Sequence, residues 1–363
     1  MTTDLLRALP RLKRLIPAFR KVRVAVVGDL MLDRYVWGEA HRLSPEADVP
    51  IVDFISQSDR LGGAGNVAAN LAELGARVEI FGCVGGKKFG GGKIGDDPAA
   101  ADFRGCLRSA GISDRTVLTD PRRITTIKTR IIARQQIVRV DRERRDSLSP
   151  DLEEKLFRSL LGSLKALDAV LVSDYNKGLV TDALAERVLH ACHKWKVPIF
   201  VKPNPSRFLA YRGASAIICN KKEAEVYVGR SLNDEKEIEE AGRALLAQFG
   251  SAAVVITLGK LGMRVFEESS PRHLNIPATS FEVTYARVGQ RGVDRKSSGR
   301  QVFDVTGAGD TVLSVFSLAM AAGASLPESA YLANIAAGVV VGKLGTASVS
   351  PAELTAALDE IPT

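Results

Sequence analysis

Long apolar runs, aromatic residues and paired cysteines are all scarce in this 363-residue sequence. No stretch approaches the roughly 20 uninterrupted apolar residues of a transmembrane helix, so no membrane span is expected. Aromatic residues make up only 6% of the chain and the basic residues are scattered, which argues against a stacking platform for single-stranded nucleic acid. The four cysteines lie far apart and form no CxxC pair, so no disulfide framework is predicted.

A secretion signal and a clear metal-binding pattern are also missing. Residues 1–19 are amphipathic and basic, without a continuous apolar core or a small-residue cleavage site, and are interpreted as a surface helix. His190 and His193 stand three residues apart on a predicted helix. They fit a metal pair or, preferably, a plain helix surface, because no cysteine or acidic partner follows in the expected pattern. We expect a cytoplasmic protein that binds neither membrane nor nucleic acid.

What is present is the composition of an ordinary globular protein, with 45% apolar and 25% charged residues. Short β-branched runs alternate with helical patterns, which predicts an α/β fold of three layers (α/β/α) with a mostly parallel central sheet. One domain is expected over about residues 20–350. The predicted strands are residues 23–28, 78–85, 168–174, 197–203, 214–220 and 252–259, and the predicted helices are residues 66–74, 151–167, 181–195, 234–249, 309–322 and 327–343. The net charge of +8 fits an anionic substrate such as a nucleotide or a sugar phosphate.

Residues 34–57 and 123–142 depart from this alternation of strands and helices, because polar and apolar side chains alternate within them. A strand with one solvated face does not belong in a buried parallel sheet, so both are predicted to form a small separate β-sheet lid. A period of two places Lys128, Arg130 and Arg134 on one face of a lid strand and Arg139 on the other. A cationic face suits a substrate that already carries a phosphate. The alternative is that these charges keep a solvated edge strand from pairing with another chain. Exposed lid edges further predict a homodimer.

Two segments rich in glycine and basic residues, 85–95 and 288–300, are interpreted as surface loops. The first superficially resembles a phosphate-binding P-loop. The P-loop pattern requires glycine at position 87 and a hydroxyl residue at 94, where this chain has Lys87 and Ile94.

The strongest functional signal is the run Thr306-Gly307-Ala308-Gly309-Asp310, which joins a strand-like segment to a long apolar helix. Glycines let backbone amides gather around an anion, and the start of a helix adds partial positive charge at the same place. Asp310 stands where it can accept a proton from an attacking hydroxyl. The plainer reading is an aspartate that favours the first turn of its helix.

The string DVTGAGDT, residues 304–311, resembles the C-terminal signature of the ribokinase-like (PfkB-type) carbohydrate kinases. The resemblance extends over about residues 20–350. It implies transfer of the γ-phosphate of ATP, with Mg²⁺, to a sugar hydroxyl. Asp310 is then the catalytic base, and the amides of Gly307, Ala308, Gly309 and Asp310 form the anion hole. The resemblance also implies that Asp304 and Thr306 border a K⁺ site, as in several relatives.

The N-terminal half carries the residues expected to bind the sugar. Gly62-Gly63-Ala64-Gly65-Asn66 resembles the same family's Gly-Gly signature, which implies sugar contacts by Gly62, Gly63 and Asn66. A dinucleotide fingerprint is the rival reading, but it requires a preceding strand, and the residues before it, SQSDRL, are polar. Asp33 and Asp29 follow a buried strand, at the edge of the sheet where ligands bind in α/β folds. They are predicted to hold sugar hydroxyls, with loop capping as the alternative.

Residues of the C-terminal half are expected to bind the nucleotide. Asn220-Lys221-Lys222-Glu223 resembles the family's Asn-x-x-Glu element, which implies that Asn220 faces the phosphates and Glu223 orders water around Mg²⁺. The same pattern also fits a helix capping box. The family's ATP edge is implied at Thr257, Gly259 and Gly262, which also fit a hairpin turn, and an adenine pocket is implied at Asn334.

Within the family, three strings resemble the heptose 7-phosphate kinases of ADP-heptose synthesis. They are GDLMLDRYVWGEAHRLSPEADVPIV (28–52), KTRIIARQQIVRVD (128–141) and LVSDYNKG (171–178). They imply that Asp174 and Lys177 lie at the substrate mouth and that the anomeric hydroxyl is the nucleophile. The chain departs from these kinases at Lys202-Pro203-Asn204, where they carry an Asp-Pro-Lys-like string, and in its two glycine-rich segments. It also lacks the His-x-Gly-His motif of their fused nucleotidyltransferase half.

Three functions are therefore compared: a heptose-phosphate kinase, a kinase of another sugar such as a ketohexose or its phosphate, and a non-catalytic regulator that binds a sugar phosphate or a nucleotide. The intact Asp310, Asn220 and Glu223 favour an enzyme over the regulator.

Overall fold

The computed structural model describes residues 3–88, 94–133, 135–279, 305–343 and 345–361. Arg134, Asp304 and the glycine-rich segment 288–300 lie outside the described residues. No helix within the described ranges is both long and apolar enough to cross a membrane.

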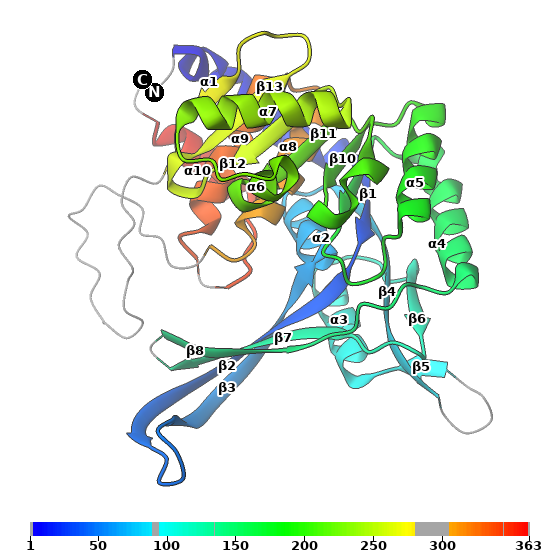
Figure 1. The fold of residues 1–363 in the computed structure, drawn as a ribbon, viewed down its shortest axis with the longest axis vertical. Helices are drawn as coiled ribbons and strands as arrows, with labels where there is room; N and C mark the ends of the chain where they lie inside the picture. Colours follow the sequence, from blue (N-terminus) through cyan, green and yellow to red (C-terminus); the bar gives the residue numbers. More distant parts are fainter. Residues whose placement is uncertain (1–2, 89–93, 134, 280–304, 344, 362–363) are drawn as a thin grey trace.

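The main sheet runs in the order β14-β13-β12-β11-β10-β9-β1-β4-β5, with β6 paired to β4 (Figure 1). All pairings from β4 through β1, β9, β10 and β11 to β12 are parallel, and only the flanking β13, β14 and β5 add antiparallel pairs. The strands are β1 (Arg23–Gly28), β4 (Arg77–Lys88), β5 (Ile94–Asp96), β6 (Val117–Asp120), β9 (Ala169–Ser173), β10 (Ile199–Lys202), β11 (Ala216–Asn220), β12 (Ala253–Thr257), β13 (Met263–Glu267) and β14 (Leu274–Ile276). The predicted mostly parallel sheet is confirmed.

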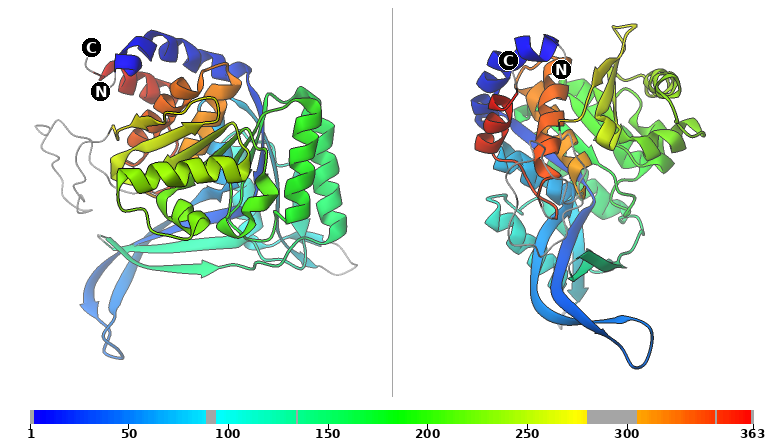
Figure 2. Two further views of the ribbon diagram at one scale, coloured as in Figure 1. Left: turned by 45° about the horizontal axis from the view of Figure 1, so that its top comes forward. Right: turned by 90° about the vertical axis from the view of Figure 1, so that its left-hand side faces the viewer.

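Helices cover both faces of this sheet (Figures 1 and 2). Alternate side chains of β1 enter two separate cores, Val24 and Val26 on one face and Ala25 and Val27 on the other. The first core includes side chains of α1 (Thr3–Leu15), α2 (Ala64–Glu73), α3 (Pro98–Ser109), α8 (Ala308–Ala321), α9 (Leu326–Val340) and α10 (Pro351–Asp359). The second includes side chains of α4 (Pro150–Ser163), α5 (Asp182–Trp195), α6 (Lys221–Val228) and α7 (Glu235–Phe249). The three-layer prediction is therefore confirmed.

A second sheet of four strands stands apart, in the order β3-β2-β7-β8. Its strands are β2 (Leu30–Leu43), β3 (Pro50–Gly63), β7 (Thr126–Ala133) and β8 (Gln135–Arg142). The β2–β3 arm projects beyond the α/β body (Figure 1). This sheet corresponds to the predicted lid, and we call it the lid below.

Two predictions about strand details were wrong. Arg139 lies directly opposite Arg130 in the antiparallel pair of β7 and β8, so both are on one face of the lid. The register shifts at a bulge between Ile131 and Ile132, so beyond the bulge the pairs join even to odd residue numbers and a period of two no longer predicts the face. The segment 85–95 is also not wholly a loop, since β4 continues to Lys88 and its end pairs with β5.

The parallel strands bring their carboxyl ends to one edge of the main sheet. Lys202 at the end of β10 lies beside Ser173 at the end of β9, and Asn220 of β11 lies beside Thr257 of β12. The N-terminal ends of α2 and α8 are at this edge too, as the contact between Asn66 and Asp310 shows. Polar residues that are far apart in the sequence are thereby collected at one place.

Candidate active site

Asp310 lies in the first turn of α8 and is only 2% exposed. The helix begins at Gly307, which has a left-handed φ of +83° and gives no side-chain cap. A Cβ at this position would lie 2.7 Å from Nδ2 of Asn66, so only glycine fits both the backbone angle and the space. The glycine thus brings the start of α8 against α2, with Asp310 between them.

Both carboxylate oxygens of Asp310 accept hydrogen bonds. Asn66 Nδ2 donates to Oδ2 over 3.0 Å, and the hydroxyl of Tyr175 donates to Oδ1 over 2.6 Å. Lys202 Nζ lies 3.0 Å from the same Oδ1 and 2.9 Å from the Tyr175 oxygen. Burial, reinforced by the charge of Asp310, raises the pKa of Tyr175, so its phenol stays protonated and remains a donor.

A buried polar chain supports Asn66. Thr311 Oγ1 donates to Oδ1 of Asn70 over 3.0 Å, and Asn70 Nδ2 donates to the backbone oxygen of Asn66 over 2.8 Å. Asn70, Thr311, Tyr175 and the contact of Lys202 with Asp310 were not predicted from the sequence. For Asn70, the local signal was its position four residues after Asn66 on an apolar helix.

The predicted anion hole has two of its four amides already in use. The amide of Asp310 donates to the oxygen of Gly307 over 3.0 Å, and the amide of Ala308 donates to the oxygen of Val305 over 3.3 Å.

Asp33 and Arg130 form a buried ion pair where the lid meets the α/β body. Arg130 Nη1 lies 2.5 Å from Oδ1 of Asp33, and the two residues are 6% and 3% exposed. Burial raises the pKa of Asp33, which the charges of Arg130 and Lys128 oppose and that of Asp310 reinforces. The geometry links the lid to the predicted base through Tyr175, whose ring centre lies 5.5 Å from Lys128 Nζ and whose hydroxyl donates to Asp310.

Gly62 and Gly63 lie between the lid and α2. Gly63 begins α2 with a φ of +57°, and a Cβ there would lie 2.5 Å from the oxygen of Asp29. A Cβ on Gly62 would lie 2.6 Å from Oδ2 of Asp33. Side chains here would displace the carboxylate of Asp33.

Asp29 is hydrogen-bonded to the loop after β9. Its two oxygens accept the amides of Leu179 at 3.0 Å, Tyr175 at 2.9 Å and Lys177 at 3.0 Å. Burial raises its pKa, and these backbone hydrogen bonds oppose the rise. Asp29 therefore anchors the loop that carries Tyr175 and Lys177, as the loop-capping alternative predicts.

Asp174 is likewise engaged inside the protein. It accepts hydrogen bonds from the hydroxyl of Tyr211 over 2.7 Å and from the amide of Asn176 over 2.8 Å. Lys177 Nζ lies 2.6 Å from Glu143. Lys128 Nζ sits 5.5 Å from the centre of the Tyr175 ring. Burial lowers the pKa of Lys128, and the nearby charges of Lys177 and Arg139 add to this effect while Asp33 opposes it.

The predicted nucleotide residues lie along β11, β12 and α9. Asn220 and Glu223 form a reciprocal capping box at the start of α6, with hydrogen bonds of 2.9 Å and 2.8 Å. Burial raises the pKa of Glu223, and the charge of Lys202 opposes this rise. Thr257 ends β12, and its hydroxyl donates to the oxygen of Cys219 over 3.5 Å.

Gly259 and Gly262, with φ of +58° and +80°, form the tight turn from β12 to β13, so the hairpin reading of this stretch holds. Asn334 Nδ2 donates to the backbone oxygen of Pro277 over 2.9 Å.

Among the described residues, no group of three or more His, Cys, Asp or Glu side chains is placed to hold a metal ion.

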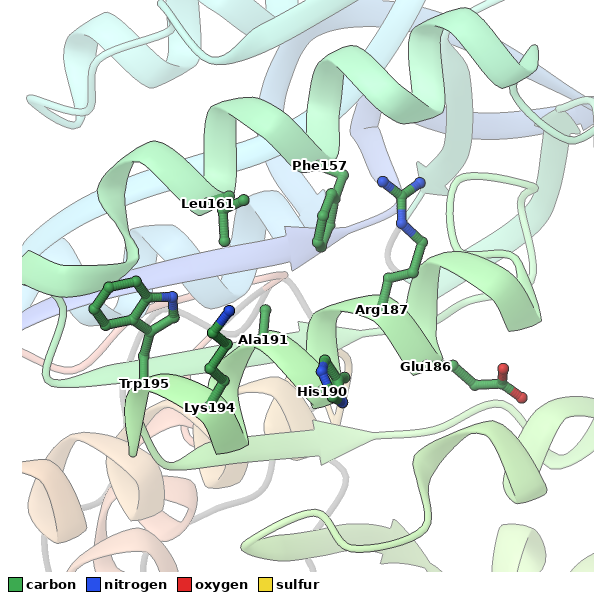
Figure 3. A pocket seen from close by; sticks show the side chains of 8 residues that line it. All are labelled: Phe157, Leu161, Glu186, Arg187, His190, Ala191, Lys194 and Trp195. Carbon is green, nitrogen blue, oxygen red and sulfur yellow. The ribbon is translucent and has the colours of Figure 1, made fainter.

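A hollow of about 740 Å³ lies between α4 and α5 and contains none of the predicted site residues (Figure 3). It is lined by Phe157, Leu161, Glu186, Arg187, His190, Ala191, Lys194 and Trp195. His193, in contrast, bonds the backbone oxygen of Gly213, so the two helical histidines do not share a ligand site.

Comparison with known proteins identifies the family. The family model described as pfkB family carbohydrate kinase matches residues 21–92 and 91–353. The chain belongs to the pfkB family of carbohydrate kinases. This confirms the predicted family and, with it, a carbohydrate kinase.

Relatives of this pfkB-family chain include the bifunctional protein HldE of Geobacter sulfurreducens, 41% identical over 338 residues, which are 93% of this chain and 63% of that protein. The HldE of Methylococcus capsulatus is 41% identical over 346 residues, 95% of this chain and 65% of that protein. This pfkB-family chain thus spans somewhat less than two thirds of these relatives.

Solved structures confirm the predicted ribokinase-like fold of this pfkB-family chain. Phosphofructokinase-2 of Escherichia coli has a TM-score of 0.72 at 17% identity, covering 93% of this chain and 99% of that one. Ribokinase of Arabidopsis thaliana has a TM-score of 0.67 at 18% identity, covering 93% and 98%.

Proposed function

We propose that this pfkB-family enzyme transfers the γ-phosphate of ATP to the anomeric hydroxyl of heptose 7-phosphate. The observation that carries the proposal is the buried carboxylate of Asp310 at the start of α8, which accepts hydrogen bonds from Asn66 and Tyr175. The heptose assignment is supported by the three sequence strings named above and by the 41% identity with bifunctional protein HldE.

In the proposed reaction, Asp310 accepts the proton of the sugar hydroxyl as its oxygen bonds to the γ-phosphorus. The bond from phosphorus to the β,γ-bridging oxygen breaks, and ADP leaves. Mg²⁺ neutralises phosphate charge when bound, with Glu223 ordering its water. Asn66 and Tyr175 aim the carboxylate of Asp310, and the start of α8 supplies amides and partial positive charge to the transferring group.

Cations at the substrate mouth support an acceptor that already carries a phosphate. Lys177, on the loop after β9, pairs with Glu143, and its charge lowers the pKa of Lys128 on the lid. The negative charge of an incoming phosphate would stabilise the ammonium of Lys128. We assign the substrate's own phosphate to these two lysines.

With ATP and Mg²⁺ present, purified protein is expected to release ADP faster with heptose 7-phosphate than with fructose, fructose phosphates, ribose or adenosine. The kcat/KM margin over unphosphorylated sugars should be at least about 100-fold, because charge-assisted contacts to the phosphate are lost with them. A coupled ADP-release assay measures this.

A parallel series with and without K⁺ tests the cation role proposed for the segment at Thr306. The proposal follows phosphofructokinase-2 of Escherichia coli, which has been solved in complex with potassium.

Lys128→Met should reduce the ratio of kcat/KM for phosphorylated sugars to kcat/KM for free sugars. Lys155→Met, on the exposed surface of α4, should leave this ratio unchanged. If a ketohexose or its phosphate is the best acceptor, the enzyme is a kinase of a different sugar. If ATP binds but no acceptor yields ADP, the protein is a binding regulator instead.

We also propose a homodimer through the lid. The outer lid strands β3 and β8 expose Phe54 (66%), Ile55 (60%) and Val140 (54%), more apolar surface than isolated exposed residues account for. Light scattering after gel filtration should give twice the chain mass. Phe54→Lys with Ile55→Lys should reduce it to one chain, and Leu161→Lys on α4, also exposed, should not. A wild-type monomer at tens of micromolar would refute the dimer.

A further inference from the structure

Lys202 brings a cation to the predicted base from a separate part of the chain. It ends β10, and its Nζ lies 3.0 Å from Oδ1 of Asp310, 108 residues away in the sequence. The Tyr175 oxygen is 2.9 Å away, and the Tyr175 ring centre is 4.5 Å away. The side chain of Lys202 therefore contacts two groups of the proposed catalytic centre, Asp310 and Tyr175.

The ammonium of Lys202 is held in its charged form. Burial lowers its pKa, but the charge of Asp310, followed by Tyr175 and Glu223, outweighs burial and raises the pKa well above the usual value. Its side chain is 14% exposed and that of Asp310 3%. The buried charges of Lys202 and Asp310 stabilise each other, because a buried charge without a partner of opposite sign lowers the stability of the folded protein.

Lys202 is also adjacent to the start of α8. A Cβ built on Gly309 would lie 3.5 Å from Nζ of Lys202 and 3.6 Å from its Cε. The charge of Glu223, proposed to order Mg²⁺, acts on Lys202 as well. The ammonium thus lies between two proposed parts of the phosphoryl-transfer centre, the base Asp310 and the start of α8.

The reaction itself removes the counter-ion of Lys202. When Asp310 accepts the sugar proton, its carboxylate becomes neutral, and the ammonium loses its anionic partner while still buried. The negative charge has then moved to the phosphoryl group and the departing ADP. The ammonium of Lys202 lies beside Gly309 at the start of α8, where it can stabilise the negative charge on the transferring phosphoryl group.

We propose that Lys202 exchanges partners: it pairs with Asp310 in the free enzyme, moves to the γ-phosphate when ATP binds, and stays with the transferring phosphoryl group while Asp310 takes the sugar proton. The inference rests on the proposed function, because it concerns the same site. Lys202 gives up no proton in this exchange: the sugar proton goes to Asp310, the new O–P bond forms at the sugar, and ADP carries away the electrons of the broken bond. Lys202 then acts as a catalytic cation in addition to Mg²⁺.

The test compares ATP with ADP, because only ATP carries the γ-phosphate. Isothermal titration calorimetry with Mg²⁺ and no sugar gives both dissociation constants. Lys202→Met should weaken ATP binding about 10-fold to 100-fold, the loss expected for one charge-assisted contact, and leave ADP binding within about 3-fold. The control Lys155→Met should change neither constant. Equal weakening of both nucleotides, or of neither, would overturn the proposal.

Asp310→Asn supplies a second comparison that does not depend on the stability of Lys202→Met. Neutralising Asp310 frees Lys202 for the phosphate, so Asp310→Asn should bind ATP more tightly than wild type. In Lys202→Met/Asp310→Asn, which leaves no unpaired buried charge, this gain should disappear while ADP binding stays unchanged. An undiminished gain in the double variant would show that Lys202 does not bind the γ-phosphate.

The two proposals fail in different ways. If wild-type protein binds neither ATP nor ADP, the proposed kinase function fails. If wild-type protein binds both and phosphorylates a sugar, but the ratio of ATP to ADP affinity is the same with and without Lys202, only the role of Lys202 fails.

Discussion

Asp310→Asn is expected to lower kcat by about 10²-fold to 10⁴-fold, the range over which a positioned general base acts. Asparagine keeps the size of the side chain and can still accept hydrogen bonds from Tyr175 and Lys202, but it cannot take the sugar proton. Steady-state ADP release at saturating ATP and acceptor measures the effect. The thermal unfolding midpoint should fall, because neutralising Asp310 leaves the buried ammonium of Lys202 without its anionic partner, so turnover is compared at a temperature at which both proteins are folded.

Asp151→Asn is the matched control, because Asp151 also lies in the first turn of a helix, α4, but is exposed. It should leave turnover unchanged. If Asp310→Asn kept more than about a tenth of wild-type turnover, Asp310 would be a helix-start residue and another group would serve as the base.

Arg130→Met is expected to lower the free energy of unfolding by about 3–5 kcal/mol, the cost of leaving one member of a buried ion pair alone. Asp33, 3% exposed, would lose the cation 2.5 Å from its carboxylate. Urea unfolding at neutral pH measures the change. Arg139→Met is the matched control, since Arg139 lies opposite Arg130 in the lid with its side chain 49% exposed, and it should change stability by less than about 0.5 kcal/mol.

The pH dependence of Arg130→Met follows from the direction of the Asp33 shift. Burial already raises the pKa of Asp33, and loss of Arg130 raises it further. A folded state with a raised carboxyl pKa binds more protons than the unfolded state, so its stability falls as pH rises through that pKa. The deficit of Arg130→Met should therefore be largest at neutral pH and shrink in acid. Asp33→Asn/Arg130→Met should recover much of the loss, and a deficit below about 1 kcal/mol at neutral pH would contradict the buried pair.

The shared edge of the main sheet explains why the site draws on distant parts of the sequence. β1, β9, β10, β11 and β12 are parallel neighbours, so the residues at their carboxyl ends converge without any local sequence signal. Asp29 illustrates the consequence. It stands at the expected place, yet its oxygens are used by the loop after β9, whose amides no sequence pattern would have placed there.

The amino-acid sequence by itself determined the alternation of strands and helices, the separate lid and the Thr306–Asp310 run, because apolar periodicity and glycine-dependent turns act over a few residues. Only the tertiary structure decided which side chains meet. Lys202 and Asp310 are 108 residues apart, Tyr175 and Asp310 135, and Arg130 and Asp33 97. Such contacts depend on strand order, on the hairpin register of the lid and on the packing of α2 against α8, which are set by the whole fold rather than by neighbours in the chain.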